Sequence, residues 1–597
     1  MLKEFENKIN EHQAQFVKAK SDSATFSWGR GILFLIAAGT LIYYFSSGVS
    51  TVLIVTGVAS IGFYYMVIQH RKREEEKTFH ETLMDINREE IKRSKLDLHD
   101  FDSGEDYIED NHPYQVDLDI FGKHSVYQLI NRCEIDDSRK KLASWLSKPA
   151  EEETVSLRQK ASKELKEMID WSQKFQSLIR ISIAQKKKRD PSLQANDILS
   201  WVKQTDKPVN LKLLKALAYF LGFVTCVVTC LVLLDYIIYQ LIYPVIFING
   251  IFLSFGIKRL QKLTTGIDKA HYIISAYAQA LELIEKEKFE SDLLTQLSQR
   301  LVTGRQSATQ SIKSLANLSY RISSRANMLY ALLDATLLLD IHLLTDLIKW
   351  KKANNQEIEK WLNVVNEFEC LVSIAGFSRV NESYAYPELE KESFAFETKK
   401  MGHPLISGKD KVTNDYLIDG KGSLDIITGS NMSGKSTFQR TVGVNMVLAQ
   451  AGCPVDAESL RMSRTQVFTS MRTKDNLEEH TSSFYAELKR IVQLLEEVEQ
   501  NTSTFFILDE ILKGTNSEDR HVGSISLAKK LTGKNAFGLI STHDLGLGEL
   551  GETDPKIRNF SFNSTLENDK IIFDYTLTPG VCKSFNASQL MKNMGIL

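Results

Sequence analysis

The residues best placed to do chemistry form one glycine-rich stretch in the last third of the chain. It follows an apolar run that begins at Ile426, and it consists of Gly429, Ser430, Asn431, Met432, Ser433, Gly434, Lys435, Ser436 and Thr437. The two glycines let the backbone turn its N–H groups toward a phosphate, Lys435 can reach the β- and γ-phosphates, and Ser436 can bind Mg²⁺. This is the pattern of a phosphate-binding P-loop, which predicts ATP and Mg²⁺ as the cofactors.

Two adjacent acids follow a second apolar run and complete a catalytic set. Asp509 is placed at a strand end to hold the Mg²⁺ shell with Ser436, and Glu510 is placed to polarise the attacking water. A third apolar run ends at His543, which can sense the γ-phosphate from the side. A lone histidine more often packs than reacts, but its position at a strand end, after the acid pair, favours a catalytic role.

The elements that must position these residues indicate three parts of the chain. Residues 401–597 read as an α/β P-loop ATPase domain of the ABC type. Residues 113–400 read as an all-α region with a membrane hairpin inserted into it, because helical periodicity dominates there. Residues 1–112 contain another membrane hairpin and a charged helix.

Long apolar runs without charge predict about four transmembrane helices in two hairpins, at 31–45, 51–68, 216–234 and 237–256. Most approach the roughly 17–25 residues that cross a bilayer, and short turns join each pair. Basic residues flank both hairpins but not their tips, so the positive-inside bias places the ATPase in the cytoplasm. A cleaved signal peptide is the alternative for the first run, but export would separate the ATPase from ATP. The expected location is therefore the cytoplasmic (inner) membrane, as an integral protein.

The composition limits the partners. Lys and Arg number 73 against 75 Asp and Glu, a formal net charge of −2, so nothing attracts the whole chain to nucleic-acid phosphates. The six cysteines show no Cys-x-x-Cys spacing, which predicts reduced thiols and no zinc site.

Several motifs resemble those of the MutS family, the DNA mismatch-repair ATPases and their relatives. The segments that carry the resemblance are 429–437, 509–519 and 541–543, together with 401–405, 412–415, 480–488, 575–580 and the lever-like 121–133. The resemblance implies a homodimer of two ATPase domains, which we call heads. Ser482 of one head reaches the γ-phosphate that the other head holds. It also places Val412 against the nucleotide base and implies mismatched or branched DNA as the ligand.

The chain also departs from that family. Membrane hairpins stand where a mismatch-reading module is expected, and Lys513 and Arg520 replace a usual arginine and glycine. The prediction is a membrane-anchored MutS-like ATPase without the mismatch-recognition module. An ABC-class transport-related ATPase is the main alternative, although no Leu-Ser-Gly-Gly-Gln-like signature is present. The other alternative is an ATP-driven membrane scaffold that does not bind DNA. A chromosome-organising ATPase fits less well, because its two nucleotide motifs would lie far apart.

Overall fold

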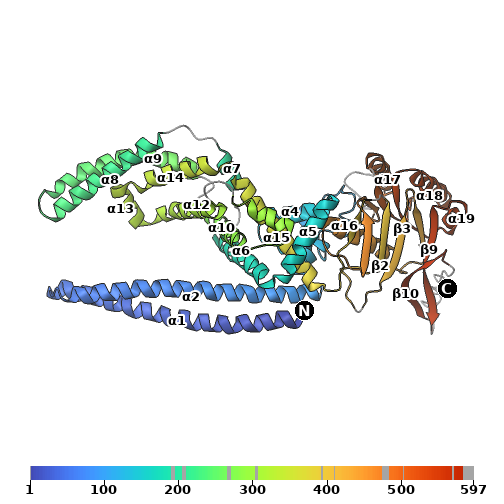
Figure 1. The fold of residues 1–597 in the computed structure, drawn as a ribbon, viewed down its shortest axis with the longest axis horizontal. Coiled ribbons are helices and arrows are strands. Elements are labelled where there is room, and N and C mark those ends of the chain that lie inside the picture. Colours follow the sequence, from blue (N-terminus) through green and yellow to red (C-terminus); the bar gives the residue numbers. More distant parts are fainter. Residues whose placement is uncertain are drawn as a thin grey trace.

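The computed structural model describes residues 2–189, 195–204, 210–264, 270–302, 307–391, 394–408, 410–472, 483–501, 503–567 and 570–582. The molecule is elongated, with two helical hairpins at one end, a helical body in the middle and two β-sheets at the other end (Figure 1). Helices dominate the first two parts, and all strands of the described residues lie in the third.

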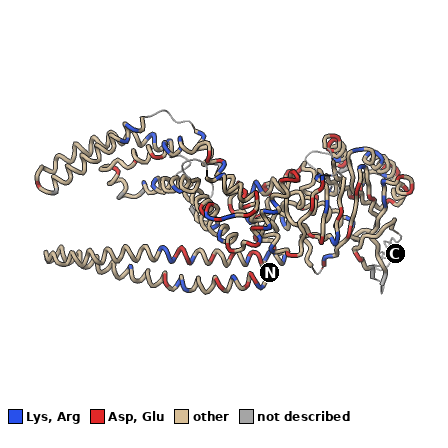
Figure 2. The backbone as a smooth tube through the Cα atoms, in the orientation of Figure 1, with Lys and Arg blue, Asp and Glu red and all other residues tan. Residues whose placement is uncertain are grey.

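The chain begins with two long antiparallel helices, α1 (Leu2–Ser47) and α2 (Val52–Ser94). At about 1.5 Å per residue each is roughly 65–70 Å long, about twice the thickness of a bilayer's hydrocarbon core. The helices therefore extend well beyond the apolar runs predicted at 31–45 and 51–68. Those runs form the tip of the pair, and the remaining turns form a charged stalk beside the helical body (Figure 2).

The helical body surrounds a long buried helix, α15. Its helices are η1 (Glu105–Tyr107), α3 (Val126–Ile130), α4 (Asp136–Ser147), α5 (Glu152–Glu167), α6 (Ile169–Arg189), α7 (Ala195–Lys203), α8 (Leu211–Leu233), η2 (Tyr239–Leu241), α9 (Ile242–Thr264), α10 (His271–Lys286), α11 (Asp292–Gln299), α12 (Ala308–Ser323), η3 (Ser324–Ala326), α13 (Met328–Leu337), α14 (Leu339–Asn354) and α15 (Ile358–Val380). From Phe368 onward every residue of α15 is buried, as expected where a helix is covered on all sides. The hydrophobic core around it continues into the sheet region without a break.

Helices α8 and α9 form the second apolar hairpin, and α13 and α14 pack along it. A small buried cluster lies between these helices: Ala218, Leu253, Leu338 and Ile341. A polar contact adds to it, because the amide of the buried Asn249 donates to Thr225 Oγ1 at 2.9 Å and to the carbonyl oxygen of Ala335 at 3.0 Å. The second hairpin is thus braced by neighbouring helices.

Among the described residues, four helical segments are long and apolar enough to cross a membrane: α1, α2, α8, and α9 together with η2. At most 17% of each apolar window is buried inside the protein, so these surfaces are largely uncovered. Both hairpin tips lie at the same end of the long axis, away from the sheets (Figure 1). Lysine and arginine are absent near both tips (Figure 2).

The strands are β1 (Glu388–Glu390), β2 (Ala395–Met401), β3 (Asn414–Asp419), β4 (Leu424–Gly429), β5 (Ser459–Ser463), β6 (Gln466–Ser470), β7 (Thr504–Asp509), β8 (Ala536–Thr542), β9 (Ile557–Glu567) and β10 (Lys570–Pro579). They form a four-stranded sheet of order β1-β5-β2-β3 and a six-stranded sheet of order β10-β9-β4-β8-β7-β6. In the larger sheet all neighbours are parallel except β10, the antiparallel edge strand.

Helices cover both faces of the larger sheet: α16 (Lys435–Ala451) lies on one, and α17 (Ser483–Gln500) and α18 (Ser517–Thr532) lie on the other. The side chains of β7 alternate accordingly. Phe505 and Ile507 join the core on the α16 side, whereas Phe506 and Leu508 join the cluster that includes α17 and α18. Helices η4 (Leu545–Glu549) and α19 (Leu550–Thr553) follow β8. Because β4, β8 and β7 are neighbours, the loops that follow them open at one edge of the sheet.

Candidate functional site

The loop between β4 and α16 depends on its glycines. Gly434 lies at the N-cap of α16 with φ of 106°, in the left-handed region that favours glycine. A Cβ atom on Gly429 would lie 2.7 Å from Oγ of Ser433 and 2.8 Å from the carbonyl oxygen of Phe562, so a larger residue does not fit. The backbone therefore makes the strand, tight loop and helix that the P-loop pattern predicts.

Lys435 and Ser436 begin α16 and make different contacts. Lys435 is buried and folds back over its own loop, where Nζ donates to the carbonyl oxygens of Gly429 at 2.9 Å and Ser430 at 3.1 Å. Burial lowers the pKa of Lys435. The hydroxyl of Ser436 donates to Oδ2 of Asp509 at 2.7 Å. The two predicted Mg²⁺ ligands are thus adjacent.

The oxygen pair of Ser436 and Asp509 suits Mg²⁺. This ion takes hard oxygen ligands and usually keeps only one or two from the protein, with water and phosphate oxygens supplying the rest. A second hydroxyl, that of Ser541, donates to the other oxygen of Asp509 and orients the carboxylate. Within the described ranges no group of three or more His, Cys, Asp or Glu side chains could hold a metal by itself. The site therefore fits an ion that arrives with phosphates.

Glu510 follows β7 with a φ of 52°, a rare conformation for a non-glycine residue that often marks a functional site. Its Oε1 lies 2.8 Å from Nε2 of His543, and its Oε2 lies 3.2 Å from Nζ of Lys513. The hydrogen bond with His543 lowers the pKa of Glu510 to about 2, and Lys513 adds to this shift. Nε2 of His543 is also 2.8 Å from Oδ1 of Asn431, so acid, histidine and loop meet at one point.

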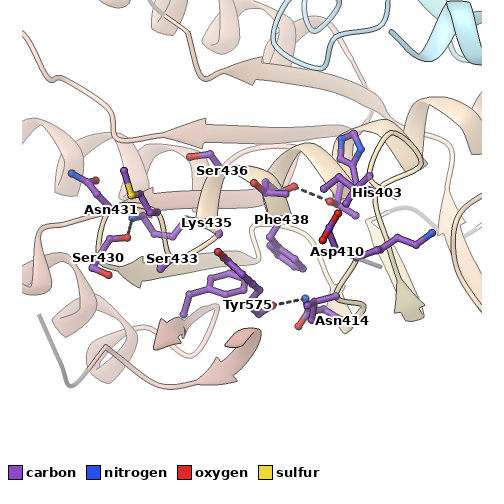
Figure 3. A pocket seen from close by; sticks show the side chains of 18 of the residues that line it. His403, Asp410, Asn414, Ser430, Asn431, Ser433, Lys435, Ser436, Phe438 and Tyr575 are labelled. Atoms are coloured by element: carbon purple, nitrogen blue, oxygen red, sulfur yellow. Dashed lines mark hydrogen bonds between the residues drawn. The ribbon is translucent and has the colours of Figure 1, made fainter. Parts of the chain in front are cut away.

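These residues border a cavity of about 710 Å³, which we call the β4 pocket. That volume is within the range of small-molecule sites. The predicted residues that line it are Val412, Ser430, Asn431, Met432, Ser433, Gly434, Lys435, Ser436, Thr437 and Glu510. Gly429, Asp509 and His543 do not line the pocket, but each is hydrogen-bonded to a residue that does: Lys435, Ser436 and Asn431, respectively. In Figure 3 the loop side chains lie on one side of the pocket, and His403, Asp410 and Asn414 lie on the other.

Three further pocket residues stand in the segments 401–405, 412–415 and 575–580, and the structure shows their individual contacts. Tyr575, with φ of 53° in the irregular part of β10, has its Cδ1 only 3.0 Å from where a Cβ on Gly434 would lie, so its ring covers the loop. Asn414 fixes this irregularity by donating to the carbonyl oxygen of Tyr575 at 3.1 Å and accepting from the N–H of Leu577 at 2.7 Å. His403 lines the far side, and burial lowers its pKa to about 4.

Ser482, the predicted trans residue, lies outside the described residues, but α17 follows it directly. The buried Glu487 of α17 accepts hydrogen bonds from the backbone N–H groups of Leu512 and Lys513, the latter at 3.1 Å. Burial raises the pKa of Glu487. The helix after Ser482 is therefore attached to the loop that carries Glu510. Glu487 stands in the segment 480–488 of the family resemblance, but the sequence predicted no role for it.

Comparison with known proteins finds similarity at this end of the chain. Residues 425–594 match the family model for MutS domain V. The similarity to that family is shown for this end of the chain. Human MutS protein homolog 4 is 30% identical over 239 residues, which are 38% of this chain and 25% of that protein. The DNA mismatch repair protein MutS of Flavobacterium psychrophilum is 29% identical over 247 residues, 40% of this chain and 28% of that protein.

The likeness is local. The DNA mismatch repair protein MSH4 of Arabidopsis thaliana is 28% identical over 220 residues, or 36% of this chain and 27% of that protein. The chain thus spans about a quarter of the length of the curated relatives that it matches. The β4 pocket lies mostly inside the MutS domain V match, whereas both apolar hairpins lie outside it.

Proposed function

We propose that this chain is a membrane-anchored ATPase of the MutS type, which converts ATP and water to ADP and phosphate. The observation that carries the proposal is the β4 pocket, where a P-loop, a Ser436–Asp509 oxygen pair and the ionised Glu510 meet. Their arrangement at the ends of neighbouring parallel strands supports an α/β P-loop ATPase domain over 401–597. The other proposed parts are a helical lever over 113–400 and an anchor over 1–112.

Each contact of the pocket has a role in the proposed reaction. Lys435 exchanges the carbonyl oxygens of its loop for the β- and γ-phosphates. Ser436 and Asp509 would hold Mg²⁺, which would neutralise phosphate charge. Glu510 takes a proton from the water that attacks the γ-phosphorus, and the bond to the β-phosphate oxygen breaks. A carboxylate with a pKa of about 2 is a weak base, so Glu510 must first lose part of its pairing with His543.

We assign this release of Glu510 to closure of a homodimer. Met432, at the loop tip, has 83% of its surface exposed, so an apolar side chain projects from the pocket toward solvent. A second head that covers it would bring its Ser482 to the γ-phosphate and let His543 turn from Glu510 to the nucleotide. The tie between α17 and the Glu510 loop then connects the two sites of the dimer.

Two defective heads can test the shared site. Lys435→Ala removes the cation for the phosphates, and Ser482→Arg places bulk and charge at the interface. Each variant alone should be nearly inactive, but a mixed dimer has one site with both halves intact. Recovery of ATPase activity on mixing supports the trans arrangement. Absence of recovery in heads that form mixed dimers contradicts it.

The apolar hairpins support anchoring in the cytoplasmic (inner) membrane with the ATPase in the cytoplasm. Their tips share one direction, their apolar surfaces are uncovered, and basic residues begin at their bases. Extraction of membranes with alkaline carbonate tests this anchoring. The intact chain should stay with the bilayer, and its release would refute the anchoring.

DNA is the proposed ligand of the lever because the names of the matched relatives refer to mismatch repair. The full chain in detergent should hydrolyse ATP faster when branched or mismatched duplex is added. If no added DNA changed the rate of ATP hydrolysis, the result would favour the alternative of an ATP-driven scaffold in the membrane.

A further inference from the structure

A second cavity lies where the second hairpin meets the helical body. Its volume is about 530 Å³, and it is bounded by α8, the end of α12, the end of α13 and the start of α14. We call it the α8 pocket. It is separate from the β4 pocket in position and in chemistry, because α8 and α13 lie toward the hairpin end of the molecule (Figure 1).

One end of the α8 pocket is charged. Nζ of Lys215 lies 2.8 Å from Oδ1 of Asp346, and Nη1 of Arg321 lies 3.6 Å from Oδ2 of the same carboxylate. All three side chains are between 32% and 39% exposed, so an incoming group can reach them. Two cations against one carboxylate leave a local charge of about +1, which matches the single negative charge of a phosphodiester.

The other end is apolar and open. Tyr219 and Phe223 follow Lys215 at helical spacing on α8, and these two residues are 61% and 67% exposed. Gly222 lies between them, and a Cβ atom there would already be in contact with the backbone of Leu337, 3.7 Å from its Cα. The pocket therefore has a cationic end and an apolar end along one helix.

This polarity agrees with the direction of the membrane. Lys215 comes directly before the apolar run 216–234, so the cationic end lies at the proposed cytoplasmic boundary and the apolar end lies within the hydrocarbon. A molecule that fills both ends has a phosphate at the interface and a chain that points toward the bilayer centre. Phospholipids of that leaflet have this form.

We propose that the α8 pocket binds an anionic phospholipid, with its phosphodiester between Lys215 and Arg321 and an acyl chain along Tyr219 and Phe223. This inference rests on the proposed membrane anchoring. The lipid would wedge between α8 and α14, so it would couple the second hairpin to the helical body. A free phosphate ion shares the charged contacts but has nothing to place in the apolar end.

The test uses the full chain in detergent micelles, with dioleoylphosphatidylglycerol, dioleoylphosphatidylcholine or sodium phosphate added. Bound lipid is counted by native mass spectrometry, and the thermal midpoint is followed in parallel. The wild-type chain should retain phosphatidylglycerol at least tenfold more tightly than phosphatidylcholine, the order of magnitude of one charged contact. Equal retention of the two lipids, or equal stabilisation by sodium phosphate, would overturn the proposal.

Three variants locate the lipid. Arg321→Gln should weaken phosphatidylglycerol binding by about tenfold. Gly222→Leu keeps every charge, improves helix propensity and fills the pocket, so it should also lose the lipid while the chain stays folded. Lys258→Gln removes an exposed cation near the end of α9, outside the pocket, and should leave binding unchanged. Loss with Lys258→Gln equal to that with Arg321→Gln would show only general attraction to the membrane and would refute the site.

A failure of this proposal is distinguishable from a failure of the anchoring. A chain that carbonate releases from membranes lacks the anchor, and the lipid site fails with it. A chain that carbonate does not release, but that binds both lipids equally, keeps the anchor and loses only the site.

Discussion

At one end of the molecule, the β4 pocket gathers charged and polar side chains from distant parts of the chain within about 3 Å of one another. At the other end, the hairpin tips exclude Lys and Arg and leave apolar side chains uncovered. The first end depends on individual atoms, so one conservative substitution should abolish its proposed chemistry. The second end depends on average polarity, so only a change of charge should disturb it.

The largest effect is expected from Glu510→Gln in the β4 pocket. The amide keeps the size of the side chain but cannot accept the proton of water, so ATP hydrolysis should slow by roughly 10²–10⁴-fold. ATP binding and membrane retention should not change. Steady-state phosphate release and nucleotide binding measure the two effects. Glu549→Gln, at an exposed acid of η4, is the control, and equal slowing in both variants would exclude a role for Glu510 as the base.

The corresponding change at the membrane end is Ile61→Arg. Ile61 lies near the middle of the apolar run 51–68 and is 73% exposed, so the charge would face lipid at a cost of about 2.5–3.5 kcal/mol. The fraction of chain that resists carbonate extraction should fall, while detergent-solubilised protein keeps its ATPase rate. Val17→Arg, on the charged stalk of α1, is the matched control. If Ile61→Arg and Val17→Arg behaved alike, the tip would not lie in the bilayer.

The same contrast explains how much could be predicted from the sequence. The P-loop, the acid pair and His543 follow recognisable strands, and the structure places them together. Tyr575 and Glu487 stand in segments that carry the family resemblance, but their contacts could not be predicted. A strand irregularity and a contact between α17 and a distant loop have no local pattern. The apolar runs showed where the hairpins are. They did not show that α1 and α2 continue as a stalk, because a polar segment with helical periodicity can also form a separate helix.

A smaller effect is expected where α17 is tied to the catalytic loop. Glu487→Ala would leave the buried N–H group of Leu512 and the part-buried N–H group of Lys513 without their acceptor, a cost of about 1–3 kcal/mol. Amide hydrogen exchange at these two residues should accelerate, and ATP hydrolysis should slow because Glu510 loses its support. Glu496→Ala, at an exposed acid on the same helix, should change neither. If amide hydrogen exchange were unchanged in Glu487→Ala, the proposed link between α17 and the catalytic loop would be wrong.

The smallest effect concerns pH, and it comes from His403 on the far side of the β4 pocket. Burial lowers the pKa of His403 to about 4 in the folded chain, against 6.5 when it is unfolded. Below pH 6.5 the unfolded state therefore binds more protons, so stability is complete above that pH and falls as the pH approaches 4. Between pH 7 and pH 5 this one group should account for about 2 kcal/mol.

His403→Asn tests that contribution, because asparagine does not titrate in this range. The thermal midpoint of the nucleotide-free chain in detergent should fall less between pH 7 and pH 5 than that of the wild type. Ile61→Arg, at the opposite end of the molecule, should keep the wild-type pH dependence because it leaves His403 in place. If His403→Asn lost as much stability as the wild type over this interval, the acid sensitivity would arise elsewhere in the chain and not from the buried histidine.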